Sequence, residues 1–291
     1  MNTIQINHIT KTYRQMTSPA LDNLTLEIGT GMFGLLGKNG AGKSTLMKIL
    51  TTLEYPTRGT ATIYGIPLTR PQEIRNLVGY LPQSFTFYPN MSVSDALAYL
   101  ATLANVPVRE QHHRIDDLLA RVNLIDKTNT KVKNLSGGML QRLGIAQALI
   151  NNPRVLIVDE PTAGLDPEER IRFRNLLADF ATDRTVLLST HIVSDIETTT
   201  NHIGILNRGQ LLFTGTTNDL IVQANDHVYE ATTSVAKATD FKQTHQVSEQ
   251  VTYDGQTHFR FIAETATDKP VHATLEEAYI YLQLQHEGVF S

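Results

Sequence analysis

Residues 37–45 carry the residue types and spacing that are best suited to binding phosphate groups. They match the pattern G-x-x-x-x-G-K-[ST] of a phosphate-binding loop. Glycines lack a Cβ, so the backbone can fold tightly and turn its N–H groups toward an anion. Lys43 supplies a compact cation, and the Ser44 hydroxyl can ligate Mg²⁺. The residues expected to bind a nucleoside triphosphate here are Gly37, Lys38, Asn39, Gly40, Ala41, Gly42, Lys43, Ser44 and Thr45.

The elements around this loop fit that interpretation. Residues 32–36 predict a buried strand before it, and the apolar spacing of residues 46–53 predicts a helix after it. The helix adds the positive end of its dipole to the anion site. The alternative is a chance glycine-rich turn, which the surrounding strand–loop–helix pattern disfavours.

Two acids follow the apolar run of residues 155–158, which predicts a fully buried strand. A carboxylate at Asp159 can hold Mg²⁺, directly or through water. Glu160 can orient or deprotonate an attacking water. The alternative is a strand that ends in two solvated acids. In a chain that also has a phosphate-binding loop, we interpret the pair as part of a hydrolytic site.

A second helix start offers another place for an anion. Ser136 is placed to cap a helix that opens with Gly137 and Gly138 and runs to about residue 150. Such a start presents free N–H groups and a positive dipole. From the residues alone, an ordinary helix cap and an anion site are equally good interpretations.

Strands and helices alternate through residues 1–223. The apolar pattern predicts a helical insertion at about residues 84–150 and a helix capped by Asp166. Further strands are expected at residues 4–6, 24–28, 60–64, 77–81 and 185–188, with a hairpin over 203–213. The fold class is therefore α/β, with a mostly parallel sheet, helices on both its faces and an N-terminal antiparallel β part.

The composition changes after about residue 224, where Thr, Gln, His and Ala dominate. Residues 250–261 predict a hairpin that turns at Asp254 and Gly255. Thr274 and Glu277 form a capping box ahead of a helix. We expect residues 224–291 to form a small C-terminal α+β module, an accessory to the domain of residues 1–223.

Length and composition limit the possible classes of protein. The chain has 291 residues, 41% of them hydrophobic, which is enough for one large domain with a small one. A formal net charge of −4 argues against a protein that coats nucleic acid. There are no cysteines, which excludes disulfides and thiolate metal sites. The first residues do not read as a signal peptide, and no apolar run approaches the roughly 20 residues that span a bilayer.

Taken together, the motifs resemble an ATP-binding cassette, the nucleotide-hydrolysing subunit of an ABC transporter, over residues 1–220. The segment 135–139, Leu-Ser-Gly-Gly-Met, is the most specific part of this resemblance. The resemblance implies a P-loop ATPase core with ATP and Mg²⁺ as cofactors. The other residues that carry it, in the order that the family shows, are the phosphate loop, Gln83, Asp159, Glu160, Ala163, Gly164, Leu165, Asp166 and His191.

The resemblance also implies roles for these residues. Gln83 would link Mg²⁺ and the attacking water to a membrane partner, and His191 would donate a hydrogen bond to the γ-phosphate. Tyr13 resembles the aromatic residue that stacks on adenine. Catalysis would then involve Glu160, His191, Gln83 and Lys43, and the metal would be held by Ser44, Gln83 and Asp159. Taken alone, Gln83 is a surface glutamine, His191 a loop residue and Tyr13 a half-buried tyrosine at the end of a strand.

In this family, Ser136, Gly137 and Gly138 would contact the γ-phosphate of ATP held by a second cassette. A dimer, most simply a homodimer, would then enclose two ATP molecules. A separately encoded membrane permease would bind the pair and hold it at the cytoplasmic face of the cell membrane; no nucleic-acid partner is expected. The tail looks like that of bacterial exporter cassettes, and the direction of transport is drawn from this analogy.

Two positions depart from the usual family pattern. Met139 stands where glutamine is common, and a thioether cannot make the hydrogen bonds of an amide. Lys38 stands where proline is frequent, which makes the loop less rigid but keeps its glycine pattern. Neither change removes a catalytic group, so hydrolysis is still expected.

Two other classes of protein remain as alternatives. A soluble cassette protein acting on ribosomes or DNA usually has two cassettes, a long coiled coil or a zinc site, none of which this sequence shows. A P-loop kinase or nucleotide sensor would leave residues 135–139 and His191 without a role.

Overall fold

The computed structural model describes residues 3–15, 17–162, 165–266 and 269–288. The chain divides into two compact units. The first unit comprises residues 1–200 and 204–211, and the second comprises residues 201–203 and 212–291.

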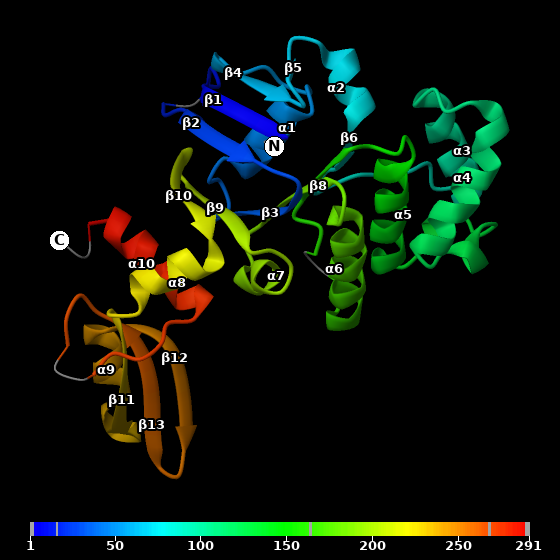
Figure 1. Ribbon diagram of the computed structural model, residues 1–291. Coiled ribbons are helices and arrows are strands. Elements are labelled where there is room, and N and C mark those ends of the chain that lie inside the picture. Colours follow the sequence, from blue (N-terminus) through cyan, green and yellow to red (C-terminus); the bar gives the residue numbers. More distant parts are fainter. Residues whose placement is uncertain (1–2, 16, 163–164, 267–268, 289–291) are drawn as a thin grey trace. The chain divides into compact units, whose positions relative to one another are not determined.

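A six-stranded sheet forms the centre of the first unit, with strand order β10-β9-β3-β8-β7-β6 (Figure 1). The pairs β3–β8, β7–β8 and β6–β7 are parallel, which confirms the predicted mostly parallel sheet. Its strands are β3 (Gly31–Leu36), β6 (Val78–Leu81), β7 (Val155–Asp159), β8 (Thr185–Thr190), β9 (His202–Asn207) and β10 (Gln210–Thr216).

The sheet lies between two hydrophobic clusters because alternate residues of each strand point to opposite faces. From β7, Leu156 and Val158 join one cluster and Val155 and Ile157 join the other. Every residue of β7 and of β8 is buried, as expected for strands covered on both faces.

One face of the sheet is covered by helices alone. Phe173 and Leu177 of α6 pack in the same cluster as Leu143 and Ile145 of α5. In Figure 1, α3 and α4 lie beside α5, and together they form the helical insertion that was predicted. The helices of this face are α3 (Val93–Leu103), α4 (Val108–Arg121), α5 (Gly137–Leu149) and α6 (Pro167–Ala181), with 3₁₀ turns at Ile125–Lys127 and Val132–Asn134.

The other face carries the antiparallel part, which confirms the N-terminal antiparallel prediction. A four-stranded sheet of order β2-β1-β4-β5 shares its core with helix α1. Helices therefore cover one face, and a helix together with a second sheet covers the other. The elements of this face are β1 (Ile4–Lys11), β2 (Leu21–Ile28), α1 (Lys43–Leu50), β4 (Arg58–Ile63), β5 (Ile66–Pro67) and α2 (Pro71–Leu77). The short helix α7 (Val193–Glu197) lies on the opposite face, where Ile196 packs against Gly34 of β3.

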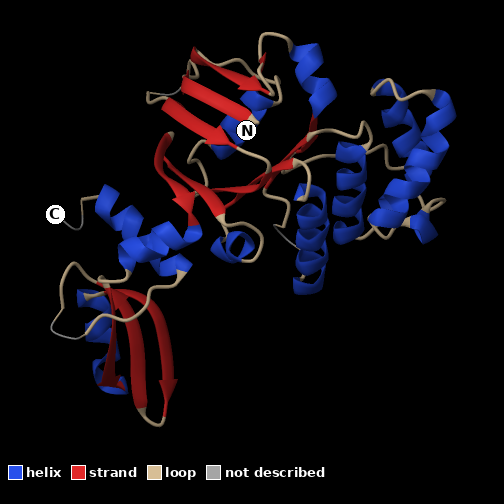
Figure 2. Ribbon diagram, in the orientation of Figure 1, coloured by secondary structure: helices blue, strands red, loops and turns tan. Residues whose placement is uncertain are grey.

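The second unit contains a three-stranded antiparallel sheet of order β11-β13-β12 with α9 against it (Figure 2). Phe241 of α9 stacks on Phe259 with 4.7 Å between ring centroids, so aromatic packing joins helix to sheet. The elements are α8 (Thr217–Ala224), β11 (Val228–Ser234), a 3₁₀ turn at Val235–Lys237, α9 (Ala238–Thr244), β12 (Gln246–Tyr253), β13 (Gln256–Ile262) and α10 (Leu275–His286).

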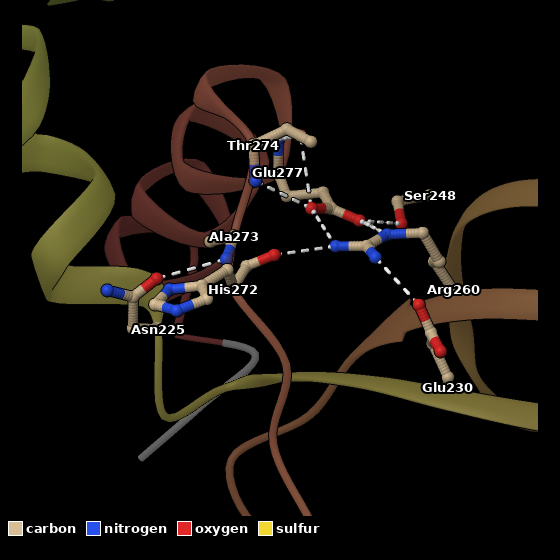
Figure 3. Close-up of polar contacts among 8 residues, drawn as sticks. All are labelled: Asn225, Glu230, Ser248, Arg260, His272, Ala273, Thr274 and Glu277. Carbon is tan, nitrogen blue, oxygen red and sulfur yellow. Dashed lines mark hydrogen bonds and ion pairs between the residues drawn. The ribbon is translucent and has the colours of Figure 1, made fainter.

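Polar contacts join α10 to this small sheet (Figure 3). The Arg260 guanidinium donates to both carboxylate oxygens of Glu277, at 2.8 and 2.9 Å. Glu277 also accepts from the Thr274 backbone N–H, while its own N–H donates to the Thr274 hydroxyl. The capping box predicted from the sequence is therefore present.

The boundary between the units falls earlier than the predicted one at residue 223. Residues 212–223, which include the end of β10 and most of α8, belong to the second unit by their contacts. The reason is that α8 packs against α10, a helix that lies more than 50 residues later in the chain.

Candidate functional site

The phosphate-binding loop lies between β3 and α1, as its sequence predicts. Gly42 has φ 108°, and a Cβ there would lie 2.5 Å from the Ala20 carbonyl oxygen. Only glycine fits both the left-handed backbone and the close approach. Lys43 is the first residue of α1, and its Nζ donates to the Gly37 carbonyl at 2.6 Å. The backbone of the loop thus holds this cation in place.

Glu160 meets Lys43 in the interior of the site. Its Oε1 lies 3.1 Å from Lys43 Nζ, and both side chains are only 5% exposed. Its Oε2 lies 2.5 Å from His191 Nδ1. Lys43, Glu160 and His191 therefore form one continuous chain of charged and polar contacts.

Asp159 and Glu160 occupy the end of β7, but their backbones and partners differ. The Asp159 carboxylate accepts a hydrogen bond of 2.6 Å from the Ser189 hydroxyl of β8. Glu160 has φ 51°, which is uncommon for a residue with a side chain. Burial and the neighbouring Asp159 charge raise the pKa of Tyr80 to about 12, so this phenol stays neutral beside the acids.

A pocket of about 450 Å³ brings much of the predicted site together. The residues that line it range in sequence from Tyr13 to Glu160. Its lining comprises Tyr13, Ala20, Asn39, Gly40, Ala41, Gly42, Lys43, Ser44, Thr45, Gln83 and Glu160. Such a volume and a cationic, N–H-rich floor suit a nucleotide with its phosphates on the loop.

The Tyr13 side chain is held at the edge of this pocket. Its hydroxyl donates to Glu54 Oε2 at 2.7 Å, and Lys11 Nζ lies 5.0 Å from its ring centroid. Burial, followed by the hydrogen bond to Glu54, raises the pKa of the Tyr13 phenol. Glu54 was not singled out in the sequence, because nothing in its spacing indicates that it meets Tyr13.

The structure separates Ser136, Gly137 and Gly138 from this pocket. Ser136 accepts a hydrogen bond of 3.2 Å from the Met139 backbone N–H and so caps α5, as predicted. Gly137 lines a different pocket, of about 420 Å³. Gln83 is the residue that lines both pockets.

The donors available for a metal are few. Among the described residues, no three His, Cys, Asp or Glu side chains gather in one place. The Ser44 hydroxyl and the Gln83 amide both line the nucleotide pocket. Two oxygen ligands from protein, with the remainder from phosphate and water, suit Mg²⁺ better than an ion that needs an all-protein cage.

The segment after Glu160 is described in part. Asp166 caps α6, with its carboxylate accepting from the Glu169 backbone N–H at 2.9 Å. Ala163 and Gly164, which contribute to the resemblance, lie outside the described residues.

Ser189, the hydrogen-bond partner of Asp159, was not predicted from the sequence. The feature that could have indicated it is the pair of polar residues, Ser189 and Thr190, at the end of an apolar strand.

Known proteins match most of the chain. The family model described as ABC transporter matches residues 21–163. A Nod factor export ATP-binding protein from Cupriavidus metallidurans is 36% identical over 221 residues, which cover 75% of this chain and 72% of that protein. A methionine import ATP-binding protein from Bacillus cereus is 36% identical over 230 residues, covering 76% and 68% of the two chains.

Other relatives are longer than the matched part. An uncharacterised ABC transporter ATP-binding protein from Synechocystis is 36% identical over 238 residues, and the match covers 79% of this chain and 66% of that protein. The match to ATP-binding cassette sub-family A member 17 of Mus musculus, at 38% identity, covers 72% of this chain but only 12% of that protein.

A solved structure has the same fold as the first unit. It is the dimeric, post-hydrolysis state of an ATP-binding cassette bound to ADP and Pi, with a TM-score of 0.67 and 27% identity. The match covers 73% of this chain and 98% of that one. Separately, within the described residues no helix is both long and apolar enough to cross a bilayer.

Proposed function

The chain belongs to the family of ABC transporter ATP-binding proteins, and on that basis we propose that it binds ATP with Mg²⁺ and hydrolyses it. The observation that carries this proposal is the contact chain of Lys43, Glu160 and His191 next to the phosphate loop. A carboxylate at that point can accept a proton from water, and Lys43 belongs to the loop that would bind the phosphates.

In the proposed reaction, the loop N–H groups and Lys43 bind the phosphates, and Tyr13 stacks on the adenine. Ser44, Gln83 and Asp159 would hold Mg²⁺, which would screen the charge of the phosphates. Glu160 takes the proton from the attacking water, and His191 donates a hydrogen bond to the γ-phosphate. Occupation of the loop gives Lys43 a new anionic partner, so Glu160 becomes available to water.

We further propose that two cassettes share each ATP. Ser136, Gly137 and Gly138 lie outside the pocket of their own chain, although their N–H groups and helix dipole suit an anion. Among the described residues, a Cβ on Gly137 would meet no atom within 4 Å, so the packing of this part of the chain does not require glycine there. A nucleotide bound by a second copy of the chain, lying close to this helix start, would explain why glycine stands there.

The proposed cellular role is to drive a membrane permease encoded as a separate chain, from the cytoplasmic face of the membrane. The named relatives include both an export and an import protein, so family membership leaves the direction open. Export remains our proposal, on the analogy of the tail. In it, the first unit acts as the cassette, and the second unit, which contains the predicted module of residues 224–291, acts as an accessory.

The variant Glu160→Gln tests hydrolysis. It should lower phosphate release by roughly 100-fold or more, as loss of a general base does, while ATP binding remains. The matched control is Glu73→Gln, whose side chain is exposed on α2 and pairs only loosely with Arg70 at 3.6 Å. Unchanged phosphate release from the Glu160 variant would contradict the proposal. Recovery of ribosomes, rather than an integral membrane protein, with the tagged chain would contradict the transport role.

A further inference from the structure

Asp195 is a buried acid to which the proposed reaction gives no role. It lies on α7 and is 1% exposed. Its Oδ2 accepts hydrogen bonds from the hydroxyls of Thr162, at 2.5 Å, and of Thr190, at the longer distance of 3.4 Å. Both donors are neutral, and both threonines are buried. Burial of a carboxylate is unfavourable unless its hydrogen bonds compensate, so this arrangement calls for an explanation.

The two threonines belong to the two segments that carry the catalytic side chains. Thr162 lies two residues after Glu160, and Thr190 directly precedes His191. The ladder between β7 and β8 ends at the pair Asp159–Ser189. Beyond it, the Glu160 backbone N–H donates to the Ser189 carbonyl at 3.0 Å. The Asp195 carboxylate joins the same two segments one step further along.

Glu160 needs such support because its backbone is strained. A residue with a side chain at φ 51° lies in a sparsely populated region of the backbone map and persists where its surroundings fix it. Pro161, the residue between Glu160 and Thr162, limits the backbone further. Holding Thr162 therefore restricts the orientation of Glu160.

We propose that Asp195 is a positioning residue for ATP hydrolysis. Through Thr162 on one side and Thr190 on the other, it holds the segment after β7 against the segment after β8, so that Glu160 stays at His191. This inference rests on the proposed function, because its purpose is to orient the hydrolytic carboxylate. Asp195 itself is not among the residues that line the nucleotide pocket.

The sharpest test compares Thr162→Val with Thr162→Ser. Valine keeps the shape of threonine but removes the donor to Asp195, whereas serine keeps the donor. We expect the valine variant to lower kcat by about tenfold or more, because small displacements of a catalytic group reduce rates strongly. KM for ATP and the affinity for ADP with Mg²⁺ should stay within about twofold. Serine should keep kcat near that of the unaltered chain.

The reciprocal pair is Asp195→Ala and Asp195→Asn. Alanine removes the acceptor, and asparagine retains one oxygen that can accept from Thr162. Rescue of kcat by asparagine is therefore expected. Glu197→Ala, on the exposed side of the same helix, is the control and should leave kcat unchanged. Equal kcat in the Val and Ser variants would overturn the proposal, and so would parallel losses of kcat, ADP affinity and thermal stability.

A second readout does not depend on hydrolysis. The imidazole NMR signals of His191, assigned by their loss in His191→Gln, report its contact with Glu160. They should shift in Thr162→Val and stay in place in Thr162→Ser. If the unaltered chain hydrolyses no ATP, the proposed function fails, and the His191 signals still decide whether Asp195 positions Glu160. Identical His191 signals in both variants would count against the inference.

Discussion

At the scale of single residues, the glycines of the candidate site are of two kinds. Gly42 has a left-handed backbone, and a Cβ there would lie 2.5 Å from the Ala20 carbonyl oxygen, so the fold itself requires glycine. Gly137, the first residue of α5, has no atom of the described residues within 4 Å of that position. Glycine at a position where the fold does not require it is best explained by contact with another molecule, here a nucleotide bound by a second copy of the chain.

Gly137→Ala should therefore separate folding from activity. We expect unchanged or slightly higher thermal stability, since alanine is favoured over glycine in helices by roughly 0.5–1 kcal/mol. ADP affinity should not change, while ATP hydrolysis should fall by about tenfold as the methyl group meets nucleotide held by a partner. Thermal unfolding, ADP titration and phosphate release measure the three quantities. Full hydrolysis by this variant would argue against a shared site.

Tyr13 allows a comparable separation of ring from hydroxyl. Tyr13→Phe loses the hydrogen bond to Glu54 but keeps the ring, so ATP affinity should change by less than about threefold. Tyr13→Ala loses the ring and should weaken ATP binding by about tenfold, the upper range for an aromatic stack. Titration with a fluorescent ATP analogue measures both. Equal affinities in the two variants would show that the ring makes no contact with the base.

Local sequence signals predict residues well when the interaction is also local. The phosphate loop and the caps at Ser136 and Asp166 were all predicted, because each involves residues within one turn or loop. The pairing of Lys43 with Glu160 and of Asp159 with Ser189 was not. Those partners meet only because three parallel strands end at one edge of the sheet, and strand order is not a local property.

At the scale of elements, the second unit depends on one polar cluster that joins α10 to its sheet. Glu277 is 3% exposed and receives hydrogen bonds from Arg260, Thr274 and Ser248 (Figure 3). Burial alone raises the pKa of Glu277, but these hydrogen bonds, above all those from Arg260, outweigh it and lower the pKa below its ordinary value of 4.5. Folding is therefore coupled to the ionised form of this carboxyl.

The sign of the pH dependence follows from that lowered pKa. The stabilisation is complete above pH 4.5 and is lost as the pH falls through the lower pKa of the folded state. Glu277→Gln should reduce the local stability of α10 by about 2 kcal/mol at pH 7 and flatten its dependence on acid pH. Hydrogen exchange of the α10 amides measures this, with the exposed Glu276→Gln as control. Equal acid sensitivity in both variants would contradict the coupling.

Two elements of the second unit that lack strong apolar patterning were not predicted from the sequence. The hairpin of β12 and β13 and the helix α10 were predicted, with their turn and capping box. The strand β11 and the helix α9 were not. β11 is mostly threonine, serine and alanine after its first residues, and α9 is a short helix held by Phe241 against the sheet. Tertiary packing rather than propensity determines both.

At the scale of the whole molecule, the proposed sharing of ATP between two copies makes hydrolysis depend on concentration. The rate per chain should rise with chain concentration and then level off, because monomers lack the Ser136–Gly138 segment at their own nucleotide. Phosphate release over a dilution series measures this, and Glu160→Gln with ATP should elute as a dimer in size-exclusion chromatography. A rate per chain that is constant under dilution would rule out the shared site.

The strand order of the central sheet also bears on how the protein is made. β8 lies between β3 and β7, yet it leaves the ribosome after both of them. Until residue 190 has been synthesised, two apolar strands on the nascent chain lack the neighbour that covers their edges. The helical insertion can pack early, since its contacts are local. Ribosome-bound fragments that stop before β8 should therefore be the ones that chaperones hold.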